Sequence, residues 1–218
     1  MAPPSYPRTP YLWAPGQRSG EDRVLASTEI SSWLEQPVIV EEKLDGANVS
    51  IWWEQSRLCV AGRGGADAMD RGSQLGALRS RVNAGYAQLR PLLEDGLVLY
   101  AEWMWLTHSV RYDLLPDYLV VLDFRRADEG FVPLCERDRL SHEHELVVPP
   151  RLFAGILGSE AALVNLMGRS RCGSELMEGA VLRRSDGQRC KVLRPGFARA
   201  SDADIGRSRN VLAPSPGP

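Results

Sequence analysis

The stretch EEKLDGAN, residues 41–48, decides how this sequence is interpreted. The apolar residues before it predict a strand over 37–42, and the residues after it predict another over 48–54. A glycine supplies the turn between the two strands. Lys43 therefore lies at the exit of a strand, and Asp45 would point to the same side if the strand continued. The pattern therefore places an amine beside a carboxylate. The same residues would also fit a β-turn with a salt bridge and no catalytic role.

The basic residues of the chain are almost all arginines. Only two of the 26 basic residues are lysines, Lys43 and Lys191. Arginine is always protonated and a poor nucleophile, whereas a lysine loses its proton when it is desolvated or lies near another cation. A divalent metal ion has the same effect on a neighbouring amine. The two lysines are therefore the first candidates for amine chemistry, with a plain compositional bias as the alternative explanation.

Length and composition limit the class of protein. The 218 residues, 44% of them hydrophobic, suit one globular domain with its own core. No apolar run approaches the roughly 20 residues that a membrane helix needs, so we expect no membrane span. The N-terminus has no charged-then-apolar leader, and the four cysteines form no CxxC pair. We therefore expect a cytoplasmic protein with reduced cysteines.

Charge is unevenly distributed along the chain. The net charge of −2 is not typical of a non-specific nucleic-acid-binding protein. Between residues 169 and 209, however, ten basic residues face five acidic ones. This basic C-terminal third is a candidate for phosphate binding, and a solvated surface explains it almost as well.

The remaining pattern predicts a mixture of strands and helices without regular alternation. That mixture predicts an α+β domain of mostly antiparallel sheets with flanking helices. A Ser-Asp-Gly turn at 185–187 predicts a hairpin between the last two strands. The predicted strands are 58–62, 97–103, 117–124, 177–183 and 188–194, and the predicted helices are 73–93, 135–146 and 159–169.

Composition also suggests three parts of the chain. Residues 1–20 are rich in proline, glycine and serine and are expected to form an extended arm. Residues 21–205 are expected to form the folded domain. Residues 206–218, which end in APSPGP, are expected to be a disordered tail.

The order of motifs resembles the covalent nucleotidyltransferase superfamily of ligases and RNA-capping enzymes, and most of all its ATP-dependent RNA ligase family. The segment KLDGAN resembles the nucleophile motif, in which the lysine, here Lys43, forms a phosphoamide with AMP. Asn48 falls on the polar position after the turn. Arg63, in VAGRGG, matches the arginine that follows, and Glu102, in LYAEWMW, matches the third motif. The resemblance covers 37–199.

The C-terminal half carries the other matching motifs. The run DYLVVLDF, which contains Leu122, matches the strand whose residues flank adenine. Glu178, in EGAVLR, matches the fourth motif, and Val181 would form an apolar wall of the base pocket. Arg189 and Lys191, in RCKVLR, match the fifth motif.

The resemblance implies ATP as the nucleotide and Mg²⁺ or Mn²⁺ as the metal. Arg189 and Lys191 would supply positive charge to the α-phosphate, which makes them catalytic together with Lys43. Glu178 is a hard oxygen ligand, and Glu102 would accept from a ribose hydroxyl or a metal-bound water. The implied nucleotide contacts are Lys43, Asp45, Asn48, Arg63, Glu102, Leu122, Val181 and Lys191, and the implied metal ligands are Glu178 and Glu102.

The fold and function that this resemblance implies are specific. We expect a nucleotidyltransferase (ATP-grasp-like) domain that adenylates an RNA 5′-phosphate through lysyl-AMP and seals it to a 3′-OH. RNA, as a nicked duplex or paired ends, would be the partner in an RNA-repair role. The sequence does not indicate a partner protein. Only 27 residues follow Lys191, so no OB domain is expected, which favours RNA ligase over DNA ligase or capping enzyme.

Two positions depart from the family pattern. The fifth motif often begins with a lysine, and here it begins with Arg189, which keeps the charge and changes the geometry. The position before Asp123 is often aromatic, and here it is Leu122, so adenine would lie between Leu122 and Val181 with less stacking.

Other interpretations remain open. A DNA ligase, a capping-type enzyme or a non-catalytic nucleic-acid-binding module on this scaffold are the alternatives. The histidines of SHEHE, at 142 and 144, diverge at i, i+2 on a helix and are expected to be solvated rather than metal-bound. His108 lies shortly after Glu102, where a substrate contact is weighed against packing or capping.

Overall fold

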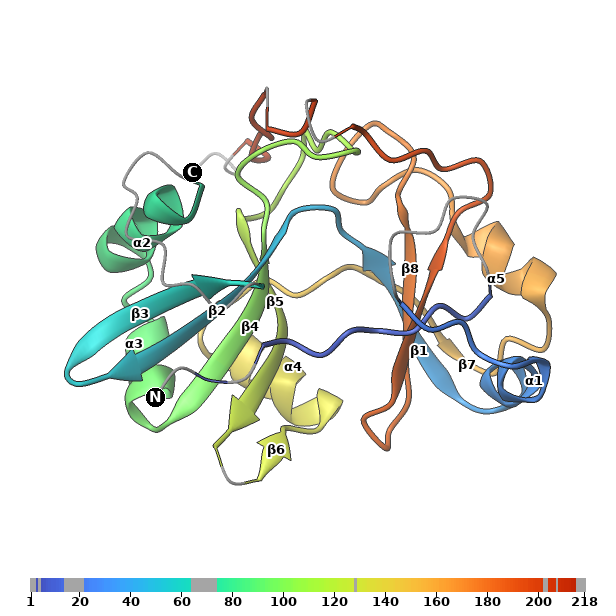
Figure 1. Cartoon of the computed structure of the whole chain (residues 1–218), viewed down its shortest axis with the longest axis horizontal. Helices are drawn as coiled ribbons and strands as arrows, with labels where there is room; N and C mark the ends of the chain where they lie inside the picture. Colours follow the sequence, from blue (N-terminus) through green and yellow to red (C-terminus); the bar gives the residue numbers. More distant parts are fainter. Residues whose placement is uncertain are drawn as a thin grey trace. The chain divides into compact units, whose positions relative to one another are not determined.

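A computed structural model of the chain describes residues 3, 5–13, 22–63, 74–127, 129–201, 204–206 and 208–214. The chain forms two compact units, which are described separately (Figure 1). Among the described residues, no helix is both long and apolar enough to cross a membrane. Unit 1 comprises Met1–Pro7, Gly46–Trp105 and Asp117–Val148, and unit 2 comprises Arg8–Asp45, Leu106–Pro116 and Pro149–Pro218.

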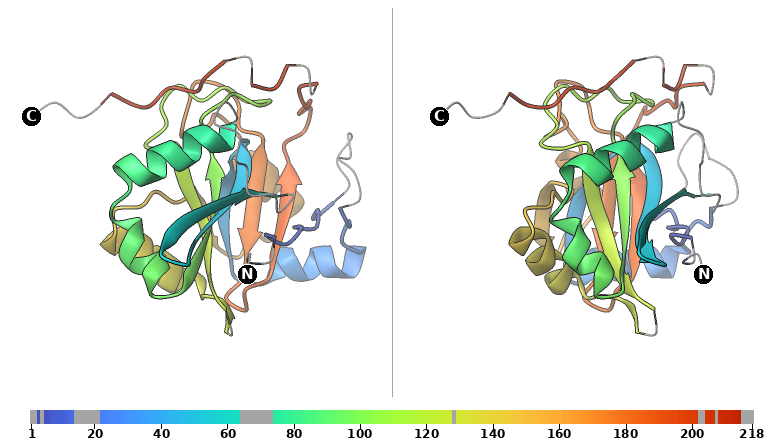
Figure 2. Two further views of the ribbon diagram at one scale, coloured as in Figure 1. Left: turned by 60° about the vertical axis from the view of Figure 1, so that its left-hand side comes forward. Right: turned by 90° about the vertical axis from the view of Figure 1, so that its left-hand side faces the viewer.

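Unit 1 is built on a five-stranded antiparallel sheet with the strand order β3-β2-β4-β5-β6. The alternation of apolar residues along each strand gives the sheet one face with a large core, which α2, α3 and α4 cover. Figure 2 shows α2 and α3 lying against the strands. The elements are β2 (Ala47–Glu54), β3 (Arg57–Gly62), α2 (Gln74–Gly85), α3 (Leu89–Glu94), β4 (Leu97–Trp103), β5 (Leu119–Arg126), β6 (Gly130–Phe131) and α4 (Leu134–Glu143).

The single helix expected over 73–93 is two helices. α2 ends at Gly85, and α3 begins at Leu89. Pro91 lies in the first turn of α3, where its missing N–H is harmless. In one continuous helix its ring would clash with the carbonyl four residues earlier, so the chain breaks before it. Residue 73 lies outside the described residues.

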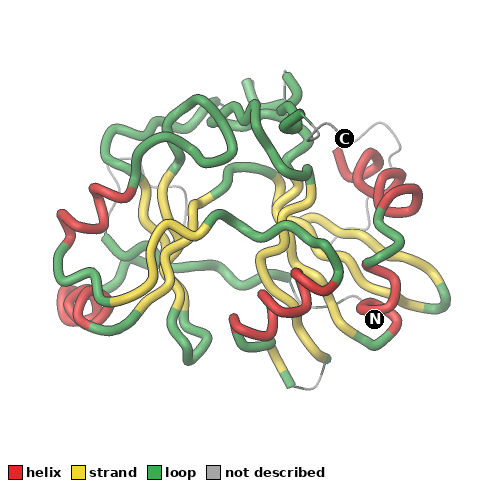
Figure 3. Tube along the Cα trace, turned by 180° about the vertical axis from the view of Figure 1, so that it is seen from behind, coloured by secondary structure: helices red, strands yellow, loops and turns green. Residues whose placement is uncertain are grey.

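Unit 2 is built on a four-stranded antiparallel sheet with the strand order β7-β1-β8-β9. Figure 3 distinguishes its strands from its helices by colour. One face of the sheet packs on Trp33 and Leu34 of α1 and on Leu163 of α5. The sequence patterns did not predict α1 or β7, which are short. The elements are α1 (Ser27–Glu35), β1 (Val38–Lys43), β7 (Arg151–Gly155), α5 (Glu160–Leu166), β8 (Gly179–Arg183) and β9 (Arg189–Leu193).

Residues from both ends of the chain pack into unit 2. The backbone N–H of Leu12 donates to the carbonyl of Lys191 at 2.8 Å, and the N–H of Lys191 donates to Pro10 at 2.9 Å. Residues 10–12 therefore run parallel to β9 at the edge of the sheet. Residues 14–20 of the expected arm lie outside the described residues.

The C-terminal residues 208–214 differ from the expected disordered tail. Asn210 is 1% exposed, and its side-chain oxygen accepts from the backbone N–H of Tyr112 and from the Thr107 hydroxyl, both at 3.0 Å. Its side-chain nitrogen donates to the carbonyl of Leu106 at 3.1 Å. These bonds offset the conformational entropy that this segment loses on ordering. Residues 215–218 lie outside the described residues, and the folded domain expected over 21–205 stays a prediction.

Candidate active site

The pairing of β1 with β8 brings Lys43 and Glu178 of unit 2 together. β1 ends at Lys43, whose register partner is Gly179, the first residue of β8. Glu178 immediately precedes that strand, and its carboxylate accepts a hydrogen bond from the Lys43 ammonium. The Lys43 side chain is 18% exposed and that of Glu178 only 1%. The site therefore couples a reachable amine to a buried carboxylate.

Gly179 allows the strands to approach at this point. A Cβ at Gly179 would lie 2.0 Å from the carbonyl oxygen of Val192 and 2.9 Å from the Cα of Leu193, both on β9. No other residue type fits that space without a shift of the backbone. The glycine after Glu178 therefore fixes where Glu178 stands relative to β1.

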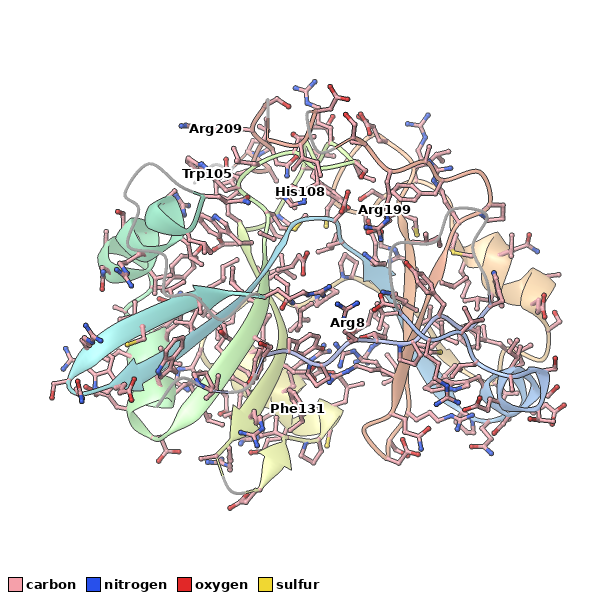
Figure 4. The ribbon with its side chains drawn as sticks, viewed as in Figure 1. Arg8, Trp105, His108, Phe131, Arg199 and Arg209 are labelled. Carbon is pink, nitrogen blue, oxygen red and sulfur yellow. The ribbon has the colours of Figure 1, made fainter. Side chains whose placement is uncertain are left out.

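Opposing electrostatic effects act on the pKa of Glu178. Burial raises the pKa of Glu178, and the negative charge of Asp45 adds to that effect. The charge of Lys43 lowers the pKa of Glu178. The charge of Arg199, which is labelled in Figure 4, does the same, because its guanidinium lies 3.6 Å from the carboxylate. The net result is a raised pKa, so Glu178 is a desolvated carboxylate whose negative charge needs a cation beside it.

The loop after Lys43 is held by the segment 106–116. The carboxylate of Asp45 accepts from the backbone N–H of Ser109 at 2.6 Å. The backbone N–H of Asp45 donates to the hydroxyl of Tyr112 at 3.0 Å, and burial raises the pKa of that buried tyrosine well above its usual value. Asp45 is therefore held in place through both its carboxylate and its backbone N–H.

His108, labelled in Figure 4, is near enough to Asp45 and Lys43 for their charges to change its pKa. Burial lowers its pKa, Asp45 raises it in opposition, and Lys43 lowers it further. Its Nε2 atom is buried and has no hydrogen-bond partner among the described residues. The net lowering keeps the imidazole neutral near pH 7, which leaves Nε2 able to accept or donate one hydrogen bond depending on its tautomer.

The predicted residues of the last two strands share one face of the unit 2 sheet. Val181 pairs with Glu41 on β1 and with Lys191 on β9, so these three form a row across the sheet. Because neighbouring residues alternate between faces, Lys43, Val181, Arg189 and Lys191 all lie opposite the apolar core of the unit. Glu41 is engaged by Arg183 in a buried pair at 2.7 Å.

Lys191 has partners that the sequence patterns did not reveal. Its ammonium donates to the carboxylate of Asp22 at 2.5 Å and lies 4.3 Å from the centre of the Tyr11 ring. The side chains of Lys191 and Asp22 are only 10% and 6% exposed. Asp22 lies in an N-terminal segment without a recognisable strand or helix pattern, so the sequence did not indicate this contact.

Unit 1 holds the other predicted residues. Asn48 on β2 and Glu102 on β4 are register partners, and both lie with Leu122 on the face opposite the large core. Glu102 accepts from the backbone N–H of Gly46 at 3.1 Å. A Cβ at Gly46 would lie 2.7 Å from both the Trp103 carbonyl and the Met104 sulfur, so this glycine is needed for the contact.

Leu122 and Arg63 are the two remaining predicted site residues of unit 1, and each contacts residues near the N-terminus. Leu122 is partly buried against a cluster that includes Tyr6 and Tyr100. Arg63 follows β3 directly, and its carbonyl accepts from the hydroxyl of Ser5 at 3.2 Å. All the predicted site residues are therefore placed, in two groups that belong to different units, and their roles toward a nucleotide stay predictions.

The carboxylates of Glu178 in unit 2 and of Glu102 in unit 1 are each hard oxygen donors of the type that a divalent cation prefers. Mg²⁺ takes oxygen ligands, keeps several waters and commonly uses one or two carboxylates together with substrate phosphates. The described residues contain no group of three or more His, Cys, Asp or Glu side chains placed to hold a metal ion by themselves. Glu178 is buried, and Lys43 and Arg199 are its ion-pair partners in the described part of the chain, so it suits a metal that also needs phosphate oxygens.

Comparison with solved structures identifies the fold. An RNA ligase of Naegleria gruberi with PPi has a TM-score of 0.61 and 19% identity, over 77% of this chain and 52% of that one. A variant of that ligase with ATP and Mn has a TM-score of 0.58 and 18% identity over the same shares. A putative ATP-dependent DNA ligase from Aquifex aeolicus has a TM-score of 0.59 and 20% identity, over 87% and 50%. This chain spans about half the length of these proteins, and it has the fold of a ligase nucleotidyltransferase domain.

Comparison with family models identifies the family. The RNA ligase model matches residues 36–195, most of the chain. The chain therefore belongs to the RNA ligase family, and both the predicted α+β fold and the predicted family are confirmed. A comparison with curated proteins found no match.

Proposed function

We propose that this chain is an ATP-dependent RNA ligase in which Lys43 is the nucleophile. The supporting observation is the hydrogen-bonded pair of Lys43 and Glu178, which places a lysine amine at a strand end beside a buried carboxylate. Membership of the RNA ligase family supports the same chemistry. The neighbouring ligase structure with ATP and Mn favours ATP and a divalent metal as cofactors.

Three displacements at phosphorus make up the proposed reaction. The neutral amine of Lys43 attacks the α-phosphorus of ATP, the bond from that phosphorus to the bridging oxygen breaks, pyrophosphate leaves, and the nitrogen gives up one proton. An RNA 5′-phosphate oxygen then attacks the phosphorus of lysyl-AMP, the P–N bond breaks, and the nitrogen takes up a proton as the Lys43 amine is released. The 3′-OH of the second RNA end finally attacks the 5′-phosphorus, loses its proton and expels AMP.

The residues around Lys43 explain how it would be activated. In the structure the ammonium donates to Glu178, which keeps the amine protonated and unreactive. A divalent metal ion bound by Glu178 would neutralise that carboxylate and lower the pKa of the amine. Arg189 and Lys191, on the same sheet face, are the proposed cations for the α-phosphate charge. Asn48, Arg63, Glu102 and Leu122 stay predicted nucleotide contacts.

The first experiment measures covalent labelling. The protein is incubated with α-labelled ATP and Mg²⁺ or Mn²⁺, and label is located on the peptide that contains Lys43. Lys43→Ala and Lys43→Arg should both lose the label, because arginine keeps the charge and lacks the nucleophile. Arg139→Ala, on the exposed face of α4, is the control and should label normally. A wild-type protein that takes no label would instead favour a non-catalytic binding module.

The second experiment identifies the nucleic acid. Nicked duplexes that differ only in the 2′-OH groups of the strand supplying the 3′ end are compared as substrates. RNA should be sealed faster, because the 2′-OH is what distinguishes RNA from DNA at one site. Equal sealing of all-DNA nicks would support the DNA ligase alternative.

A further inference from the structure

Unit 2 contains a cavity that the proposed adenylation chemistry does not use. Its volume is about 520 Å³, within the range of small-molecule sites. Residues from 109–110, 169–176 and 194–198 line it. We call it the arginine pocket, because Arg169 and Arg194 both contribute to its wall.

Both arginines of this pocket have positive charge that no acidic side chain neutralises. Arg169 donates to the carbonyl of Ser174 at 2.8 Å. Arg194 donates to the carbonyls of Met177 at 2.8 Å and Pro195 at 3.4 Å. Within the part of the chain that the structure describes, neither guanidinium forms an ion pair. Each guanidinium has five N–H groups, so several donors remain for an anion.

The acidic and hydroxyl groups of the pocket are already engaged. The carboxylate of Glu175 accepts from the backbone N–H of Arg111 at 3.2 Å. The Ser174 hydroxyl donates to Asp113 at 2.7 Å, and the Ser109 hydroxyl accepts from the N–H of Ala200 at 3.1 Å. One carboxylate against two guanidinium groups leaves the lining with a net positive charge.

The same pocket has an apolar wall. Leu176 is 50% exposed, which is unusual for a leucine that has a core available to it. The Phe197 ring lies 5.5 Å from the guanidinium carbon of Arg194. A bare phosphate or pyrophosphate has no use for an apolar wall, whereas a nucleotide combines a phosphate with an apolar base face.

Hydrogen bonds connect the pocket to the surroundings of Lys43. The backbone N–H of Ser109 donates to Asp45, two residues after Lys43. The backbone N–H of Arg194 donates at 3.0 Å to the carbonyl of Glu178, which is the partner of Lys43. The pocket and the proposed nucleophile therefore belong to one hydrogen-bonded framework of unit 2.

Other arginines of the basic C-terminal third have partners within the unit. Arg183 forms the buried pair with Glu41, and Arg184 stacks at 4.1 Å on the Trp33 ring. Arg199 lies 3.6 Å from Glu178. Arg183, Arg184 and Arg199 are therefore weaker candidates for phosphate binding than Arg169 and Arg194 of the arginine pocket.

We propose that the arginine pocket binds a nucleotide of the RNA strand, with its phosphate on Arg169 and Arg194 and its base or ribose against Leu176 and Phe197. This inference rests on the proposed function, because it assigns the second substrate of that reaction. The pocket would hold the strand while its 5′-phosphate meets lysyl-AMP.

The test measures RNA binding by the full chain with a short fluorescein-labelled 5′-phosphorylated RNA. Arg169→Ala should weaken binding about tenfold, the loss of a hydrogen-bonded charge, and should lower the slope of log affinity against log salt by about 0.7. Leu176→Ser should weaken binding with an unchanged salt slope, because it removes apolar contact alone. Arg139→Ala is the matched control, since it removes the same charge from an exposed helix position in unit 1.

Two further measurements separate this inference from the proposed function. Arg169→Ala should take label from ATP at the wild-type rate and should join a pre-adenylated RNA donor about tenfold more slowly at limiting RNA. Wild-type RNA binding by both Arg169→Ala and Leu176→Ser would overturn the inference. A change in the ATP dependence of labelling without a change in RNA binding would also overturn it, and would assign the pocket to ATP. Failure of the wild type to label at all would count against Lys43, and the RNA-binding comparison would still decide the pocket.

Discussion

The ammonium of Lys43 donates to the carboxylate of Glu178, a residue 135 positions later in the chain. The contact exists because β1 and β8 pair in register, so the last residue of one strand faces the first residue of the other. An exposed ion pair of this kind contributes little to folding stability, but the carboxylate of Glu178 is almost fully buried. Its charge therefore has to be balanced by Lys43, Arg199 or a metal ion.

Removal of the Glu178 carboxylate should change metal dependence more than stability. In Glu178→Gln the side chain keeps its shape and loses its charge, so a hard cation loses an oxygen ligand. The Mg²⁺ concentration that gives half-maximal labelling of Lys43 should rise at least about tenfold. A Mg²⁺ titration identical to that of the wild type would remove Glu178 from the metal site. Thermal unfolding of both proteins shows whether the fold is intact.

The pair of Asp22 and Lys191 should contribute measurably to stability. Asp22→Ala leaves a largely buried ammonium without its carboxylate, which should cost about 2 kcal/mol of unfolding free energy. Arg8 contacts the same carboxylate at 3.2 Å and is 61% exposed, so Arg8→Ala is the matched control and should cost less than about 1 kcal/mol. Equal losses in urea denaturation would show that Lys191 is not the important partner.

The same aspartate predicts a pH dependence. Burial raises the pKa of Asp22, but the hydrogen bonds and charges of Lys191 and Arg8 outweigh it and leave the pKa below its ordinary value of 3.8. A carboxylate whose pKa is lowered by folding stabilises the protein above its unfolded-state pKa, and that contribution is lost as the pH falls through the folded-state pKa. The stability difference between wild type and Asp22→Ala should therefore shrink below pH 3.8. A difference that stays constant into that acid range would contradict the pairing.

Gly179 should not tolerate a side chain. Gly179→Ala places a methyl group 2.0 Å from the Val192 carbonyl, so the strands must separate at an estimated cost of about 1–3 kcal/mol. Labelling of Lys43 should fall as well, since Glu178 moves with the strand. Gly168→Ala is the control, because nothing lies within 4 Å of its added Cβ. If Gly179→Ala unfolds at the wild-type urea concentration, the close approach of β8 and β9 is wrong.

In the native protein, the thiol of Cys135 should react with alkylating reagents much faster than the thiols of the other cysteines. Cys135 is exposed, while Cys59, Cys172 and Cys190 are buried. Burial raises the pKa of the Cys172 thiol to about 12 and raises that of Cys190 as well, so neither forms a thiolate near neutral pH. Iodoacetamide should modify the native protein at Cys135 and the unfolded protein at all four cysteines. Cys135→Ser should abolish native modification, and mass spectrometry would reveal any other modified thiol.

Local patterns in the sequence predicted much of the fold and most of the candidate residues. Strand alternation located β1, β2, β4, β5, β8 and β9, because these strands have one face on a core. The order of motifs indicated Lys43 and Glu178, which the structure then places in contact. Their roles in catalysis stay predictions.

The features that the sequence did not reveal depend on pairings between distant segments. The strands on either side of Gly46 belong to different sheets, β1 with β8 and β2 with β4, and nothing in EEKLDGAN indicates that division. The contact of Asp22 with Lys191 joins residues 169 positions apart. Arg183 belongs to the basic C-terminal third, for which a solvated surface was one explanation, yet it is buried against Glu41. A charge pattern does not show which face of a strand is covered.

The edge pairing of residues 10–12 with β9 has a practical consequence for how the protein is produced. The family match begins at 36 and stops at 195. A fragment trimmed to those limits would lack Leu12, Trp33 and Leu34, which complete the apolar core of the unit 2 sheet. It would also lack the buried Asn210, and its β9 would be left as an open edge that invites aggregation. The homology boundary is thus not a folding boundary, and expression vectors, affinity tags and proteolytic trimming should respect the longer limits.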